Sequence, residues 1–255
     1  EADLGITIFD RSVKGMRLTP DGEEFVQYAR RILRQIGEME QLYKGTLQKK
    51  QQFSISVPRA SYIAEAFAEF SKSLTDDDAE LFYKETNSQR TIKNILEHDY
   101  KLGILRYAAP YDVYFKTMLE EKNLSHELVT EFTYRLVISK QHPLAAVEEV
   151  TFDDLRPYIE VAHADPYVPS LPLSKVVKEE LPDNVNRRIF VFERASQFEL
   201  LSRNPETFMW MSPLPQDLLD RYGLVEKICA ENTRVYRDIL VYRSNYHLTE
   251  LDRQF

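Results

Sequence analysis

Polar side chains that suit an anion follow several predicted strands of this chain. Arg59 and Ser61 come directly after the strand at 53–57 and begin a helix, where backbone N–H groups favour negative charge. Similar residues follow the next two strands and a strand at 158–162: Thr86, Asn87, Ser88, Arg106, Tyr107, His163 and Tyr167. Open α/β sheets bind small molecules at the carboxyl ends of their strands, so these residues are candidates for a ligand site.

A structural interpretation competes with this one. Ser61 and Ser88 can serve only as helix caps, and the arginines can be ordinary surface charges. Both interpretations stay open from the residues alone.

The residue pattern does not favour an enzyme, a metal site or a cofactor. Five histidines are scattered without metal-ligand spacing, and neither a G-x-S-x-G motif nor a phosphate-binding glycine loop occurs. Asp76 to Asp78 are typical of a solvated turn, although three adjacent carboxylates resemble a metal cluster. Trp210 among apolar neighbours is expected in a core, with stacking on a ligand as the alternative.

A small basic hairpin is predicted near the start of the chain. Arg11, Lys14 and Arg17 lie in a stretch, 11–20, that holds no acidic residue, and Gly15 supplies a turn. Three cations on a hairpin suit contact with nucleic-acid phosphates, which positions a protein without reading sequence. The alternative is an ordinary solvated hairpin.

A long amphipathic helix follows, with Thr19 as its N-cap and Pro20 as its first residue. Its apolar residues recur at spacings of 4, 3, 4, 3 and 4: Phe25, Ala29, Ile32, Ile36, Met39 and Tyr43. This heptad seam predicts a partner helix from a second copy. Packing on its own domain is the alternative, which the polar stretch 48–52 makes less favourable.

The hairpin and the helix start resemble the second half of the winged helix-turn-helix of LysR-type transcriptional regulators. The pattern L-G-x-x-x-F-x-R-x-x-x-G-x-x-L-T-x-x-G is carried by Leu4, Gly5, Phe9, Arg11, Gly15, Leu18, Thr19 and Gly22. The resemblance implies that the hairpin is the wing and that the long helix is the linker that dimerises the DNA-binding domains. It also implies that the helices that read DNA are absent from this chain.

Composition allows two compact domains and a cytoplasmic location. The chain has 255 residues, of which 43% are hydrophobic, with no run long enough for a membrane span and no secretory signal. Its one cysteine excludes an internal disulfide. The net charge of −8 is concentrated after residue 50, so DNA contact is expected only from the local basic patch.

Strands and helices alternate through the rest of the chain, which predicts mostly parallel sheets covered by helices. An extended stretch at 127–139 and a last strand at 234–242 divide this alternation into two α/β units with a ligand cleft between them. A helix is expected at 173–181 in the second unit.

This region resembles the effector-binding part of LysR-type regulators, whose fold is like that of periplasmic solute-binding proteins (type 2). The features that carry the resemblance are Val57 with Pro58, Asn87 with Ser88, 101–105, 142–145 and 152–155. The glycine-poor stretch 203–213 departs from the family pattern, which leaves the pocket floor undefined. The implied domains are a wing remnant (1–19), a linker helix (20–50), subdomain I (51–131 with 232–255) and subdomain II (132–231).

The resemblance implies two Rossmann-like subdomains joined by two crossover strands and preceded by a wing hairpin and a dimerisation helix. The implied function is transcriptional regulation of promoter DNA by a dimer or tetramer. A small effector, for which the residues favour an anion, would bind between the subdomains, and RNA polymerase is an implied contact. No cofactor, catalysis or membrane is implied. The alternative is a solute-binding protein of a transport system, against which the heptad seam and the basic hairpin argue.

Overall fold

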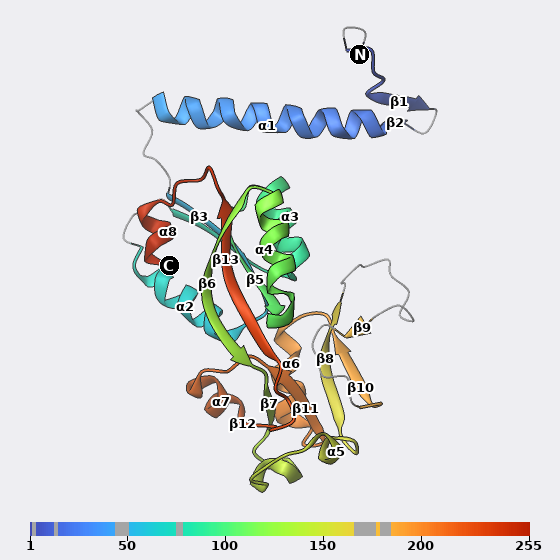
Figure 1. Ribbon diagram of the computed structural model, residues 1–255, viewed down its shortest axis with the longest axis vertical. Helices are drawn as coiled ribbons and strands as arrows, with labels where there is room; N and C mark the ends of the chain where they lie inside the picture. Colours follow the sequence, from blue (N-terminus) through green and yellow to red (C-terminus); the bar gives the residue numbers. More distant parts are fainter. Residues whose placement is uncertain (2–3, 13–14, 44–50, 75–78, 166–176, 179–184) are drawn as a thin grey trace. The chain divides into compact units, whose positions relative to one another are not determined.

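The computed structural model describes residues 1, 4–12, 15–43, 51–74, 79–165, 177–178 and 185–255 (Figure 1). The chain divides into two compact units, Glu1–Gln51 and Gln52–Phe255. None of the described helices is both long enough and apolar enough to cross a membrane.

A hairpin and one long helix make up the first unit: β1 (Phe9–Ser12), β2 (Gly15–Leu18) and α1 (Pro20–Tyr43). The Thr19 hydroxyl accepts a hydrogen bond of 2.9 Å from the backbone N–H of Gly22, which confirms Thr19 as the cap and Pro20 as the first helical residue. A Cβ at Gly22 would lie 2.0 Å from the carbonyl oxygen of Ile8, so only glycine lets the helix start pack against the hairpin.

The first sheet of the second unit has five strands in the order β4-β3-β5-β13-β6. Their bounds are β3 (Gln51–Val57), β4 (Ala79–Glu85), β5 (Leu102–Ala108), β6 (Leu124–Thr133) and β13 (Val235–Arg243). The helices beside it are α2 (Ser61–Lys72), α3 (Ser88–Glu97), α4 (Asp112–Glu121) after the 3₁₀ turn η1 (Ala109–Tyr111), and α8 (Glu250–Gln254).

Side-chain alternation along β5 fills two apolar layers, one on each face of this sheet. Leu102 and Ile104 pack with residues of α2 and α8, whereas Leu105 packs on the opposite face with residues of α3 and α4. Figure 1 shows α2 and α8 on one side of this sheet and α3 and α4 on the other. Phe53 contributes to the first layer, where the centre of its ring lies 4.7 Å from the centre of the Phe70 ring. Both faces of the sheet are therefore buried, as expected for an α/β fold.

The second sheet has the order β10-β8-β11-β7-β12, and β9 pairs with β8. Its strands are β7 (Arg135–Ser139), β8 (Ile159–Asp165), β9 (Val177–Lys178), β10 (Arg188–Val191), β11 (Thr207–Met211) and β12 (Leu224–Lys227). The helices are α5 (Phe152–Leu155), α6 (Ala195–Arg203), α7 (Gln216–Tyr222) and the 3₁₀ turn η2 (Pro143–Ala146). Leu136 and Trp210 face the α5 side, and Val137 and Met209 face α6 and α7.

Two passages of the chain join the sheets, from β6 to β7 and from β12 to β13 (Figure 1). This confirms the predicted pair of α/β subdomains with two crossovers. The expectation of mostly parallel sheets was wrong, because β13 returns between β5 and β6 and pairs antiparallel with both. In the second sheet β7 likewise runs antiparallel to β11 and β12.

The prediction of a helix at 173–181 was also wrong for the two residues of that range that the structure describes. Val177 and Lys178 form β9, which pairs antiparallel with Ala164 and Asp165 at the end of β8. The β-branched Val177 favours a strand, and the end of β8, beyond the residues that pair with β10, offers it hydrogen bonds. The rest of that range lies outside the described residues.

Gly103 lets α3 lie close to the centre of the first sheet. A Cβ at this position would lie 2.5 Å from Cγ2 of Thr91 and 2.8 Å from Cδ1 of Ile95. We expect Gly103→Ala to lower the free energy of unfolding by about 1–3 kcal/mol through overpacking. Urea unfolding followed by fluorescence of the single tryptophan, Trp210, measures this.

The matched control is Gly37→Ala, because a Cβ at Gly37 in α1 meets nothing within 4 Å. This variant should leave the tryptophan transition unchanged. Equal midpoints for Gly103→Ala and the unsubstituted protein would contradict the close contact.

Candidate anion-binding site between the two sheets

A cavity that is partly open to solvent lies within the second unit and is lined from both sheets. Its wall is formed by Arg59, Ser61, Arg106, Tyr134, His163, Arg194, Gln197, Met209, Trp210, Met211, Ser212 and Leu214. Four of the nine residues predicted for a ligand site are thus brought together: Arg59, Ser61, Arg106 and His163. The glycine-poor stretch 203–213 supplies Met209 to Ser212, so its strand β11 forms one wall of the cavity.

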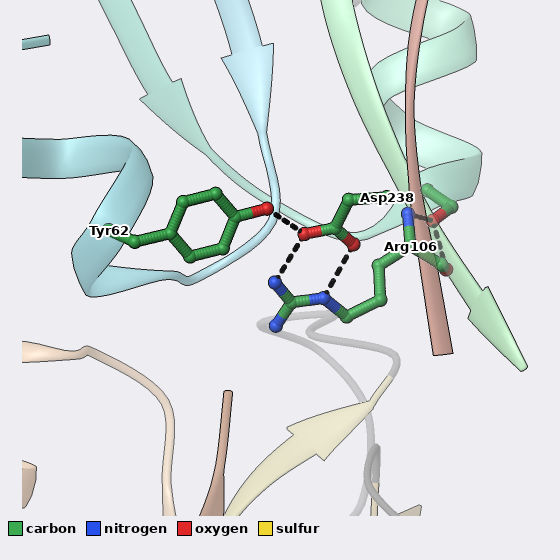
Figure 2. Close-up of polar contacts among 4 residues, drawn as sticks. Tyr62, Arg106 and Asp238 are labelled. Atoms are coloured by element: carbon green, nitrogen blue, oxygen red, sulfur yellow. Dashed lines mark hydrogen bonds and ion pairs between the residues drawn. The ribbon is translucent and has the colours of Figure 1, made fainter. Parts of the chain in front are cut away.

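Arg106 is held by a buried carboxylate. It lies on β5 opposite Asp238 of β13, and its Nε and Nη2 donate to the two carboxylate oxygens at 2.8 and 2.6 Å (Figure 2). The Asp238 side chain is fully buried, and the Tyr62 hydroxyl of α2 donates to the same carboxylate. The guanidinium carbon also lies 4.6 Å from the centre of the Phe132 ring.

Burial and charge act together on this group. Burial raises the pKa of Tyr62 far above its ordinary value, and the Asp238 carboxylate raises it further. Burial alone would lower the pKa of Arg106, but the carboxylate beside it outweighs burial and raises that pKa. Arg106 therefore stays charged on the cavity wall, and its charge is largely balanced by Asp238 before any ligand arrives.

Three predicted ligand residues act as backbone anchors and do not line the cavity. The Ser88 hydroxyl donates to the carbonyl oxygen of Arg106 and accepts from its N–H, at 2.8 and 3.0 Å, which ties α3 to β5. Asn87 caps α3 by accepting from the N–H of Arg90 at 2.9 Å. Thr86 is buried, and its N–H donates to the carbonyl oxygen of Val57.

Tyr107 and Tyr167 are not placed at the cavity by the structure either. Neighbouring residues of a strand point to opposite faces, so Tyr107 points away from the face of Arg106. Its ring stacks on Phe115 at 4.3 Å and its hydroxyl donates to Asp112. Tyr167 lies outside the described residues.

Two arginines connect the sheets at the cavity. Arg194, just before α6, donates to Oε1 of Glu85 and to the hydroxyl of Ser61, both at 2.6 Å. Arg59, from the opposite side, reaches the carbonyl oxygen of Phe192 at 3.5 Å. Arg194 was missed in the sequence, although it follows β10 in the way that Arg59 follows β3.

His163 lies at the end of β8 and is neutral at physiological pH. Burial lowers its pKa to about 3, and the positive charge of Arg59 contributes. A neutral imidazole adds no positive charge to the cavity, so the cationic groups on its wall are the arginines.

Nothing in the described part of the chain gathers three or more side chains of His, Cys, Asp or Glu that could hold a metal ion. Asp76 to Asp78 lie outside the described residues. Trp210 is 1% exposed and packs edge-on against Phe208, with ring centres 6.4 Å apart, which confirms the core interpretation.

The predicted DNA-facing and self-association residues belong to the first unit. Arg11 lies on β1 and the exposed Arg17 on β2, whereas Lys14 lies outside the described residues. Four seam residues of α1 are exposed: Phe25, Ile32, Ile36 and Met39. Ala29 is half-buried, and Tyr43 ends the helix.

Comparisons with known proteins found no matching family model. Two curated relatives are the HTH-type transcriptional regulator AlsR of Bacillus subtilis, 29% identical over 168 residues, and a probable RuBisCO transcriptional regulator of Phaeodactylum tricornutum, 28% identical over 166 residues. These matches cover 64% and 61% of the chain, and 52% and 49% of the relatives. The chain thus spans about half the length of the curated relatives that it matches.

Solved structures share the fold. Full-length OxyR of Pseudomonas aeruginosa matches with a TM-score of 0.58 and 12% identity, over 95% of this chain and 76% of that one. The effector-binding domain of QuiR in complex with shikimate matches with a TM-score of 0.52 and 15% identity, over 81% and 93%. Both support an α/β region of periplasmic-binding-protein type.

The Arg106–Asp238 pair gives a stability prediction. Asp238→Asn would leave the buried guanidinium without its counter-charge, so we expect a loss of about 3–5 kcal/mol in the free energy of unfolding. Urea unfolding followed by Trp210 fluorescence measures it.

The control is Asp220→Asn, which breaks an exposed pair with Lys140 of 3.0 Å whose side chains are 51% and 58% accessible. Solvent screens this pair, so its loss should lower stability by less than about 1 kcal/mol. Similar losses for the two variants would show that the buried pair does not hold the sheet.

Proposed function

We propose that this chain is part of a DNA-binding transcriptional regulator controlled by a small anionic effector. The premise is its LysR type, which its sequence pattern, its fold and the relatives that it matches support. The observation that carries the proposal is the cavity lined from both sheets by Arg59, Arg106 and Arg194. No catalytic role is proposed, and we propose a cytoplasmic location because the proposed target is promoter DNA.

The chemistry of the cavity favours an anion. Ser61 is the first residue of the 12-residue helix α2, and its N-cap, Ala60, offers no side-chain acceptor to the helix N–H groups. A helix N-terminus with adjacent guanidinium groups attracts a carboxylate or phosphate. The apolar Met209, Met211 and Leu214 on the other wall suit a carbon skeleton.

The proposed mechanism links the cavity to the assembly. An effector that contacts both subdomains favours one of their arrangements, and it shifts the population only if it binds the two arrangements unequally. The changed subdomains alter how protomers pack, so that a dimer or tetramer presents its winged helices to DNA and to RNA polymerase with a different spacing or bend.

The first unit supplies the proposed DNA and dimer contacts. Arg11, Lys14 and Arg17 of the hairpin would meet phosphates beside the DNA-reading helices of the full-length protein. The exposed apolar residues of α1 would pair with those of a second copy. We retain the predicted boundaries of these parts, 1–19 and 20–50.

A ligand screen tests the effector site. Thermal shift against small anionic metabolites, shikimate among them, with sugars and amino acids alongside, should yield an anion that stabilises the protein. We expect Arg59→Ala to weaken its binding at least about tenfold in titration calorimetry, since a hydrogen bond to a charged group is worth about 1.5–3 kcal/mol.

The control for the screen is Arg156→Ala, which removes an exposed arginine that pairs with Asp153 and does not line the cavity. Equal affinities for the two variants would remove Arg59 from the site. A panel without any stabilising anion would count against the effector proposal itself.

The seam of α1 gives a separate test. Ile32→Asp combined with Ile36→Asp should reduce the mass measured by light scattering, because charged residues would be buried between the paired helices. Gln35→Asp adds a charge to an exposed position off the seam and should leave the mass unchanged. An unchanged mass in the double variant contradicts the seam.

A further inference from the structure

Arg194 bridges the two subdomains. It comes from the second sheet, between β10 and α6, yet its two terminal nitrogens bind Glu85 at the end of β4 and Ser61 at the start of α2. Both contacts measure 2.6 Å. The chain therefore places one of its own carboxylates on an arginine of the cavity.

The Glu85 carboxylate sits in a polar cluster. The Tyr83 hydroxyl donates to Oε1 of Glu85 at 3.4 Å, the same oxygen that accepts from Arg194. Burial raises the pKa of Tyr83, and the Glu85 carboxylate raises it further, so the phenol stays a neutral donor. This carboxylate thus holds a position that an external anion would need in order to bind Arg194.

The two ion pairs of this region differ in their contact with water. In the Arg106–Asp238 pair the side chains are 10% and 0% accessible, whereas in the Arg194–Glu85 pair they are 18% and 21% accessible. Water weakens and exchanges an accessible pair, and a buried pair does not separate without leaving an uncompensated charge. The accessible pair is therefore the one that a ligand can replace.

We propose that Glu85 is a built-in competitor for the effector's anionic group, so that the effector binds by taking Arg194 from Glu85 and thereby releases a tie between the subdomains. This inference rests on the proposed effector site. Because only molecules with Arg194 released bind fully, Glu85 lowers the apparent affinity for every anion. The same exchange couples occupancy of the cavity to the arrangement of the two sheets.

The first test compares affinities for acetate, benzoate, shikimate and inorganic phosphate by titration calorimetry. Glu85→Gln removes the competing charge, and we expect it to tighten binding of at least one of these anions about fivefold. Glu97→Gln is the matched control, since it removes the same charge from an exposed pair with Lys93. Its affinity should equal that of the unsubstituted protein. Equal affinities for the two variants overturn the competitor role.

The second test needs no ligand. Spin labels at Lys72→Cys and Arg221→Cys, exposed positions on α2 and α7, report the distance between the subdomains, and the native Cys229 is buried. We expect Glu85→Gln to broaden the distance distribution and Glu97→Gln to leave it narrow. Adding Arg194→Gln to Glu85→Gln also removes the hydrogen bond from Arg194 to Ser61, so any further broadening reports the loss of that bond and not of the ion pair.

The two measurements separate the proposals. If the unsubstituted protein and Glu85→Gln both bind none of the four anions, the effector proposal fails, and the distance measurement still decides whether the tie exists. If anions bind but Glu85→Gln neither tightens binding nor broadens the distances, the effector site stands and the competitor role is overturned.

Discussion

The buried contact between Arg106 and Asp238 joins the two strands on which the effector-binding region depends. β13 returns from the second sheet to the middle of the first, and Asp238 meets Arg106 directly across the strand pair. Each of these two buried charges is stabilised by the other. A shift in the register of β5 and β13 would therefore leave both charges buried without a counter-charge. Tyr62 adds a third attachment, from α2 to the same carboxylate. The pair therefore fixes the strand that links the subdomains and the helix whose first turn faces the cavity.

Local patterns in the sequence determined most of the elements but not their pairing. The capped start of α1 could be read directly, and the structure confirms it. The antiparallel return of β13 could not be read, because its partners lie more than a hundred residues away in the sequence. Because of the same separation, the sequence does not reveal Asp238 as the partner of Arg106. The predicted ligand contact Arg106 is first of all half of an internal ion pair.

In the candidate site, too, local patterns predicted some residues, whereas contacts between distant parts of the chain could not be predicted. Arg59 and Ser61 were found because residues after a strand and at a helix start share one edge of a sheet. Tyr107 was included although it adjoins Arg106 on one strand, where alternation sends the two side chains to opposite faces. Arg194 satisfies the rule that found Arg59, but its partner Glu85 is known only from the way the two subdomains meet.

The free energy that a small ligand gains on binding limits which ion pair the ligand can break. A small ligand with a Kd between millimolar and micromolar gains about 4–8 kcal/mol in all. Breaking a sealed pair such as Arg106–Asp238 would consume about 3–5 kcal/mol of that gain, whereas a pair that water partly reaches costs less to separate. An effector that rearranged the sealed pair would bind too weakly to act at ordinary concentrations. The responsive contact must therefore be one that water already reaches, and Arg194 with Glu85 meets that condition at the cavity.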